Sequence, residues 1–290
     1  MKYFKLVILV IAVSLAASFF GTRLFSGQTK QIESNKPVSL LSMVLEKGEI
    51  RAGYVIDPPA LIKDPNTGAL SGIFYDTMQE AGKNLGLKIN WVEEAGWGTM
   101  IEGLEAGRYD IIVTDLWPNA ARSKSIDFTN ALYYIPIGVY VRPGDNRFSN
   151  LNAINSSDIT IATIDGEMSS LIAQTDFSQA KVISLAQDTP VSQVLLNVST
   201  KKADVTFAQP AIAEEFLANN PGAVENIAKE NPVRYFPNTM GVPKDEEGFK
   251  SMINTALEEL SNNGTVDRLI AQYEKYDGSY YPVAKPYILP

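Results

Sequence analysis

The chemistry open to this chain is limited first by two residue types that it lacks. Its 290 residues include no histidine and no cysteine. A Ser-His-Asp triad, a histidine-bound metal, a zinc thiolate site and a cysteine nucleophile are therefore excluded. The sequence also has no Walker A loop and no GxGxxG motif, so it predicts no metal and no cofactor. Carboxylates, lysine, tyrosine and hydroxyl groups remain as the reactive groups.

Several polar and aromatic residues stand at or just after the ends of expected strands. In α/β sheets, ligands bind beyond the carboxyl ends of the strands. Residues at these places in both halves of the chain predict a cleft between two lobes. The candidates are Asp57, Trp97, Asp115, Trp117, Asn119 and Arg122 in the first half, and Gly166, Glu167, Ser169 and Gln209 in the second half.

The elements that position these residues alternate between strand and helix. Apolar runs predict strands at 49–54, 87–92, 109–114, 132–141, 159–163, 182–185 and 203–208. Helical spacing predicts helices at 74–85, 100–104, 166–173, 191–198, 249–260 and 266–273, one beginning near Pro210, and a short one capped by Asn119. This order predicts an α/β fold whose lobes have mostly parallel sheets.

Composition narrows the class of protein. Hydrophobic residues make up 45% and charged residues 20% of the chain, which is typical of a folded globular protein. The formal net charge is -8, and no basic run occurs. Nucleic-acid binding needs clustered lysine and arginine, so nucleic acid is excluded as a partner.

The N-terminus carries an export signal or a membrane anchor. Lys2 and Lys5 precede an uncharged, mostly apolar run at 6–22, and Ala16-Ala17-Ser18 offers small residues for cleavage. A run of this length also reaches the lower limit for a spanning helix, so a cleaved signal and an uncleaved anchor both stay open for residues 1–25. Residues 26–42 are expected to form a polar linker. Either alternative places the protein outside the cytoplasm, in the periplasm or at the cell surface.

Over about residues 43–278, the chain resembles the bacterial extracellular solute-binding proteins of family 3, the substrate-binding proteins of polar amino-acid ABC transporters. The most similar segment, 97–129, runs from Trp97 through Leu104, Gly107 and Asp110 to Asn119-Ala120-Ala121-Arg122 and Asp127-Phe128-Thr129. The resemblance implies a two-lobe, type II periplasmic-binding-protein-like fold with a hinge and an inter-lobe ligand cleft. It also implies that Arg122 pairs with the ligand α-carboxylate, that Trp97 stacks on the ligand, and that the turn at Gly166 offers backbone donors.

Departures from the family pattern concern the charge of the cleft. Gln209 stands where the family has the acid that holds the ligand α-ammonium, and Glu167 replaces a hydroxyl residue. Asp57 stands near a family aromatic, and Asp115 stands where small residues are usual. Either Asp57, Asp115 and Glu167 take over the ammonium, or the ligand is not an ordinary α-amino acid.

Each candidate also has a purely structural alternative. Arg122 could form a surface ion pair with Asp127. Trp97 and Trp117 could serve only as packing. Asp115 could orient Arg122, and Glu167 could be a solvated residue in the first turn of a helix.

The resemblance predicts one lobe from 43–135 plus 236–280 and a second from 136–235, with hinge crossings at both ends and a tail at 281–290. We expect a monomeric, non-enzymatic protein that captures an amino-acid-like solute and delivers it to an ABC uptake permease. The alternatives are an enzyme similar to cyclohexadienyl or arogenate dehydratase on the same scaffold, and a membrane-tethered module that senses a ligand.

Overall fold

A computed structural model describes residues 38–283 of the chain. The expected signal or anchor, most of the expected linker and the end of the expected tail lie outside the described residues. Across residues 38–283, no helix is both long enough and apolar enough to cross a membrane.

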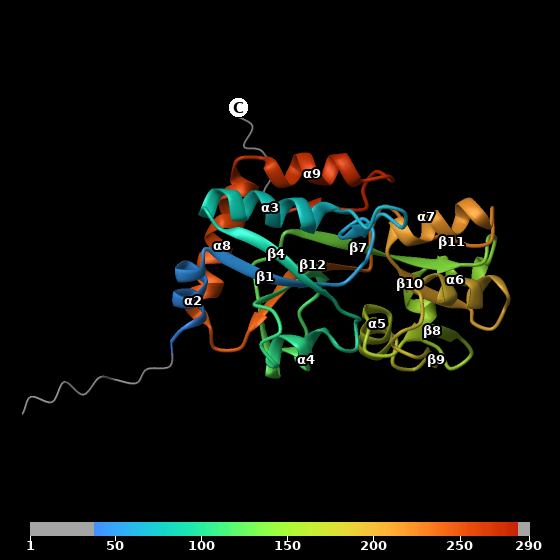
Figure 1. Cartoon of the computed structure of the whole chain (residues 1–290). Helices are drawn as coiled ribbons and strands as arrows, with labels where there is room; N and C mark the ends of the chain where they lie inside the picture. The colour runs from blue at the N-terminus through green and yellow to red at the C-terminus, as the bar shows by residue number, and fades with distance from the viewer. Residues whose placement is uncertain (1–37, 284–290) are drawn as a thin grey trace, which may run out of the picture. The chain divides into compact units, whose positions relative to one another are not determined.

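The first strand group is built on parallel pairs near the N-terminal end of the described chain (Figure 1). β1 pairs in parallel with β4 on one side and with β5 on the other. β12 continues the sheet in the antiparallel direction, and β6 pairs with its last residues. The strands are β1 (Glu49–Tyr54), β4 (Lys88–Glu94), β5 (Ile111–Leu116), β6 (Ile126–Phe128) and β12 (Arg234–Pro243).

The second strand group repeats this plan further along the chain. β8 pairs in parallel with β9 and β10, and β7 adds to β10 in the antiparallel direction. Small strands complete the edges: β11 and β13 pair with β7, and β2 pairs with β3 in a separate hairpin. The strands are β2 (Ile62–Lys63), β3 (Leu70–Ser71), β7 (Tyr133–Val141), β8 (Thr160–Ile164), β9 (Lys181–Leu185), β10 (Val205–Ala208), β11 (Glu225–Asn226) and β13 (Tyr281–Pro282).

Two long strands run between the two groups, as Figure 1 shows. The first half of β7 pairs with β12 from Ile137↔Arg234 to Tyr133↔Asn238, and its second half pairs with β10 in the second group. The second half of β12 pairs with β5 and β6 in the first group. Both connections between the groups are therefore extended backbone.

Helices bury apolar faces against both groups. α3 packs on α8 and α9 beside the first group, while α4 packs on β1 and β5. α5 and α6 pack on β8 and β10 in the second group, and α7 packs on α6 and β7. The helices are α2 (Leu40–Lys47), α3 (Ile73–Leu85), α4 (Met100–Glu105), α5 (Met168–Asp176), α6 (Ser192–Ser199), α7 (Pro210–Asn219), α8 (Glu247–Asn262) and α9 (Thr265–Tyr273), with 3-10 turns η1 (Arg122–Lys124), η2 (Asn146–Phe148) and η3 (Leu151–Ile154).

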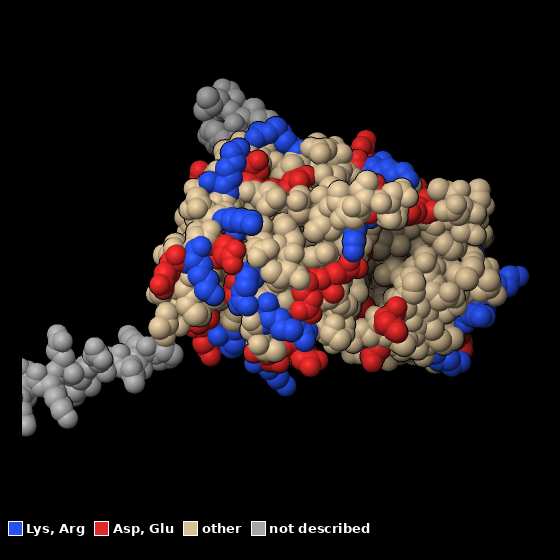
Figure 2. Space-filling model, viewed as in Figure 1, with Lys and Arg blue, Asp and Glu red and all other residues tan. Residues whose placement is uncertain are grey.

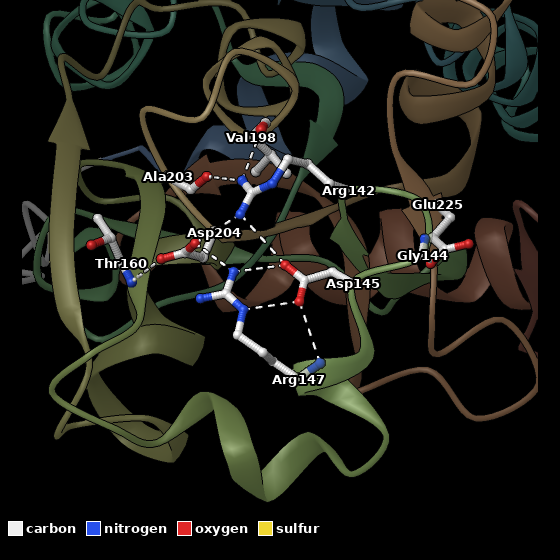
Figure 3. Close-up of polar contacts among 9 residues, drawn as sticks. All are labelled: Arg142, Gly144, Asp145, Arg147, Thr160, Val198, Ala203, Asp204 and Glu225. Atoms are coloured by element: carbon white, nitrogen blue, oxygen red, sulfur yellow. Dashed lines mark hydrogen bonds and ion pairs between the residues drawn. The ribbon is translucent and has the colours of Figure 1, made fainter.

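A cluster of ion pairs connects the residues just after β7 to the rest of the second group (Figure 3). The Arg142 guanidinium donates to the carbonyl oxygens of Val198 and Ala203, and lies 2.8 Å from an Asp204 carboxylate oxygen. Arg147 lies 2.7 Å from the same oxygen, and the other Asp204 oxygen accepts a hydrogen bond from the Thr160 backbone N–H. Asp204 is therefore the common acceptor of two arginines and the start of β8.

Some expected boundaries differ from the structure. Helix α2 begins at Leu40, inside the range 26–42 expected as linker, because Leu40 and Val44 are buried in the core. Strand β13 begins at Tyr281, where a tail was expected, because it adds to the edge of β7. The short helix expected after Asn119 is the 3-10 turn η1.

Candidate functional site

A cavity of about 650 Å³ lies between the two strand groups. Figure 2 shows the surface hollowed there, with acidic side chains beside the hollow. Cavities of this size hold small solutes. Six of the ten candidate residues line it, namely Asp57, Trp97, Asp115, Trp117, Glu167 and Gln209.

Two aspartates come to this cavity from neighbouring strands. Asp57 follows β1, and its backbone forms a bridge with Leu61 through two hydrogen bonds of 3.0 Å. Asp115 lies inside β5 rather than after it, because the strand extends to Leu116, where it pairs with Thr239 of β12. The parallel pairing of β1 with β5 sets both carboxyl groups at the same end of the sheet.

Burial makes both aspartates hard to ionise. The pKa of Asp57 is raised to about 6, chiefly by burial and further by the charge of Glu167. The pKa of Asp115 is raised well above its ordinary value by burial and by the neighbouring Asp57 carboxylate. Two tyrosines, Tyr133 and Tyr280, lie close enough to feel the charge of both acids. In the absence of a cation, this pair therefore favours a protonated carboxyl more strongly than isolated aspartates do.

Two tryptophans give the cavity flat apolar walls. Trp97 packs against the small core around Tyr109. Trp117 is buried and packs edge-on against Phe236 of β12, with ring centroids 5.4 Å apart. Its indole N–H donates to a Glu167 carboxylate oxygen at 3.3 Å. Trp117 therefore packs against Phe236 and also makes a polar contact with Glu167, a residue of the second strand group.

Arg122 is buried and does not line the cavity. Its side chain is 8% exposed, and one guanidinium nitrogen donates to the Trp117 carbonyl oxygen at 3.2 Å. The guanidinium carbon lies 5.5 Å from the centre of the Trp117 ring. A second nitrogen lies 3.7 Å from a Glu167 carboxylate oxygen. Arg122 thus pairs with Glu167, while Asp127, the alternative partner, pairs with Lys244.

Burial and this contact act in opposite directions on the pKa values of both partners. Burial lowers the pKa of Arg122, and the carboxylate of Glu167 opposes that change. Burial raises the pKa of Glu167, while Arg122 and the Trp117 N–H oppose it. Glu167 also precedes the first residue of α5, where the partial positive charge of a helix N-terminus favours an anion.

The other three candidates shape the backbone near the cavity. The Asn119 side chain accepts a hydrogen bond from the Arg122 backbone N–H at 2.8 Å, which holds η1 in place. The Ser169 hydroxyl accepts from the Ile164 backbone N–H at 3.0 Å. Gly166 has a φ of 72°, a left-handed conformation that lets β8 turn into α5. None of these three is among the described residues that line the cavity.

Sequence reasoning missed part of the wall. The loop after β9 contributes a run from Gln187 to Ser192, and one face of α7 contributes Ile212, Glu215, Phe216 and Asn219. The loop follows the carboxyl end of a strand, so the rule that found Asp57 also applies to it. Within residues 38–283, no group of three or more acidic side chains is placed to hold a metal ion.

A family model decides where the chain belongs. The model of the bacterial extracellular solute-binding proteins, family 3, matches residues 50–276. The chain belongs to this family. In this family 3 solute-binding protein, the matched region includes strands of both groups and the connecting strands β7 and β12.

Curated relatives of this family 3 protein include named binding proteins. A probable histidine-binding protein of Campylobacter jejuni is 27% identical over 208 residues, which cover 71% of this chain and 77% of the relative. L-cystine-binding protein TcyA of Bacillus subtilis is 24% identical over 252 residues, which cover 84% and 88%. Membrane-bound lytic murein transglycosylase F of Enterobacter is 22% identical, but the chain spans only 53% of that relative.

Solved structures confirm the fold. An ancestral amino acid-binding protein described as a precursor of cyclohexadienyl dehydratase aligns with a TM-score of 0.64 and 22% identity, over 82% of this chain and all of that one. A mutant of ArgBP from T. maritima aligns with a TM-score of 0.61 and 22% identity, over 80% and 98%. The two-lobe, type II fold expected from the sequence is thus confirmed.

Proposed function

We propose that this family 3 protein captures a small amino acid or a closely related amine in the cavity and delivers it to an ABC uptake permease. The cavity carries the proposal, because both strand groups supply its walls. The named relatives support the ligand class, since they include proteins named for binding histidine and L-cystine. One chain supplies both walls, so a monomer is sufficient. Family membership supports a site of action outside the cytoplasm.

The hinge is part of this proposal. The lobes would be 43–135 plus 236–280 and 136–235, and they would move about β7 and β12. These two strands connect the groups, and extended backbone can absorb a change in angle over few residues. A ligand that contacts both walls stabilises the closed form, because only that form makes all of its contacts. The permease would then recognise the closed form.

Ligand-dependent stability tests this proposal. The protein is first unfolded and refolded to remove any solute, then melted with single amino acids, amines and small carboxylates. A ligand at 100 times its dissociation constant stabilises the fold by about 2.7 kcal/mol, which raises the Tm by about 5–10 °C. We expect at least one amino acid or amine to do so. If no compound of either class shifted the Tm of the folded protein, the proposal would fail.

We propose that binding occurs without catalysis. The chain lacks histidine and cysteine, and the half-buried Asp57 and Asp115 lie beside each other and near Tyr133. An acid with a raised pKa is also what a dehydratase needs, so the alternative is tested directly. Incubation with prephenate or arogenate should give no change in absorbance beyond the rate without protein. Multiple turnovers would instead establish an enzyme.

A further inference from the structure

The cavity wall has an unbalanced charge. Five acidic residues line it: Asp57, Asp115, Glu167, Asp188 and Glu215. Among the described residues of the wall, none is lysine or arginine. An anionic group that enters this space therefore meets repulsion from several directions, while a cation is attracted from both strand groups.

The guanidinium of Arg122 is already paired with a carboxylate of the chain. Arg122 is buried, and the polar contacts of its guanidinium within residues 38–283 are made by Trp117 and Glu167 of the chain itself. Glu167 reaches Arg122 from the second strand group, and its other oxygen accepts the Trp117 indole N–H. The chain thus supplies, across the cavity, the carboxylate that would otherwise come from a solute. A solute with its own carboxylate would have to displace Glu167 into a cavity that is already acidic.

The two aspartates of the cavity wall have no lysine or arginine beside them among the described residues that line the cavity. Asp57 and Asp115 line the cavity side by side, and Tyr133 and Tyr280, whose ring centroids are 5.1 Å apart, lie near both aspartates. The Tyr133 hydroxyl is fully buried and has no hydrogen-bond partner among the described residues. A buried hydroxyl without a partner costs free energy, and so does a buried carboxylate pair. A protonated amine or guanidinium would supply hydrogen-bond donors to both aspartates.

We propose that the ligand is a small organic cation without a carboxylate, an amine or guanidine, and that Glu167 occupies the place of the missing carboxylate on Arg122. This inference rests on the proposed function and narrows its ligand class. Asp57 and Asp115 hold the cationic group, the faces of Trp97 and Trp117 contact its alkyl chain, and Glu167 links the two strand groups through Arg122. Such a ligand corresponds to an amino acid without its carboxylate.

Matched pairs of compounds test the inference. Cadaverine and lysine differ by one carboxylate, as do agmatine and arginine. Calorimetry on the refolded, ligand-free protein should give tighter binding of the amine in at least one pair, by about tenfold or more. If lysine and arginine each bound as tightly as their partner amines, the inference would be wrong and the proposed function would stand. If the folded protein bound none of these four compounds while another amino acid stabilised it in the thermal screen, the inference would be wrong and the proposed function would stand.

Two variants identify the residue responsible. Glu167→Gln removes the internal carboxylate and keeps the shape, so Arg122 becomes available to a ligand carboxylate. We expect the preference for the amine over its amino acid to fall by about tenfold or to reverse. Glu214→Gln removes the same charge from an exposed position on α7 outside the cavity wall, and should preserve the preference. An unchanged preference in Glu167→Gln would overturn the role given to Glu167, and the wild-type pairs decide the ligand class if that variant does not fold.

Discussion

Replacing Asp57 with asparagine should stabilise the ligand-free protein at neutral pH. The substitution keeps the size of the side chain and removes a carboxyl group that burial holds at a pKa of about 6. The backbone bridge between Asp57 and Leu61 does not use the side chain, so it is retained. The charge of Asp57 also raises the pKa of Asp115, so its removal lessens the cost of the second acid too.

The magnitude follows from the difference between folded and unfolded states. The unfolded pKa is about 3.9, and a raised folded pKa means that the folded state holds the proton more tightly. Wild-type stability is therefore highest below pH 4 with respect to this group, and is lost as the pH rises to about 6. Two units of pKa correspond to about 3 kcal/mol, which Asp57→Asn should recover above pH 6.

Thermal melting of both proteins between pH 4 and pH 8 measures this effect. The Tm of Asp57→Asn should exceed that of the wild type by about 6–12 °C at pH 8 and match it at pH 4. Asp188→Asn removes an exposed carboxylate from the same cavity and should change stability by less than about 0.5 kcal/mol. A Tm difference that stays constant over this pH range would refute the reasoning. So would a less stable Asp57→Asn at pH 8.

Four further substitutions test the fold and the site. Asp204→Asn should lower the free energy of unfolding by about 1–3 kcal/mol in urea, because Arg142 and Arg147 keep Asp145 but lose the second carboxylate that they share; an unchanged value would contradict the role of that cluster. Gly72→Ala should cost more than about 3 kcal/mol, since its φ is 117° and a Cβ would lie 2.7 Å from the Ala60 carbonyl oxygen. Gly48→Ala, at a φ of 69° with open space around it, should cost only about 1 kcal/mol, and equal costs at the two glycines would be inconsistent with this account. Tyr133→Phe should be neutral or stabilise the ligand-free protein by about 1 kcal/mol, because the lost hydroxyl has no partner among the described residues; a clear loss of stability would show that the hydroxyl is bonded.

Much of the fold could be predicted because the chain places its signals locally. The apolar run at 49–54 predicts β1 at its observed bounds, and the helical spacing at 74–85 predicts both ends of α3 to within one residue. Candidate residues chosen at strand ends, such as Asp57 and Gln209, do line one cavity. This worked because parallel strands bring their carboxyl ends to one edge, a consequence of chain direction that the sequence already contains.

The remaining features depend on contacts between distant residues. Arg122 and Glu167 are 45 residues apart in the sequence, and no local pattern near either residue predicts that they form a pair. Asp115 lies inside β5 because β12, far along the chain, extends that strand. The first three residues of α2 fall in the expected linker, because residues 26–42 are mostly polar and the burial of Leu40 is set by packing against the core. Such features are set by packing and pairing, which spacing within one segment does not reveal.

The pH dependence of cation binding tests the central claim most directly. Trp97 and Trp117 border the cavity, so their fluorescence can follow a titration with cadaverine between pH 5 and pH 8. The acids that line the cavity are Asp57, Asp115, Glu167, Asp188 and Glu215. Tyr133 and Tyr280 lie near the two aspartates, and burial raises the pKa of both tyrosines, so they stay neutral in this range. Because the cation favours ionised aspartates, affinity should rise with pH by up to about tenfold per unit for each proton released, most steeply below pH 6. An affinity that did not change over this range, or that was higher at pH 5, would contradict a cation held by Asp57 and Asp115.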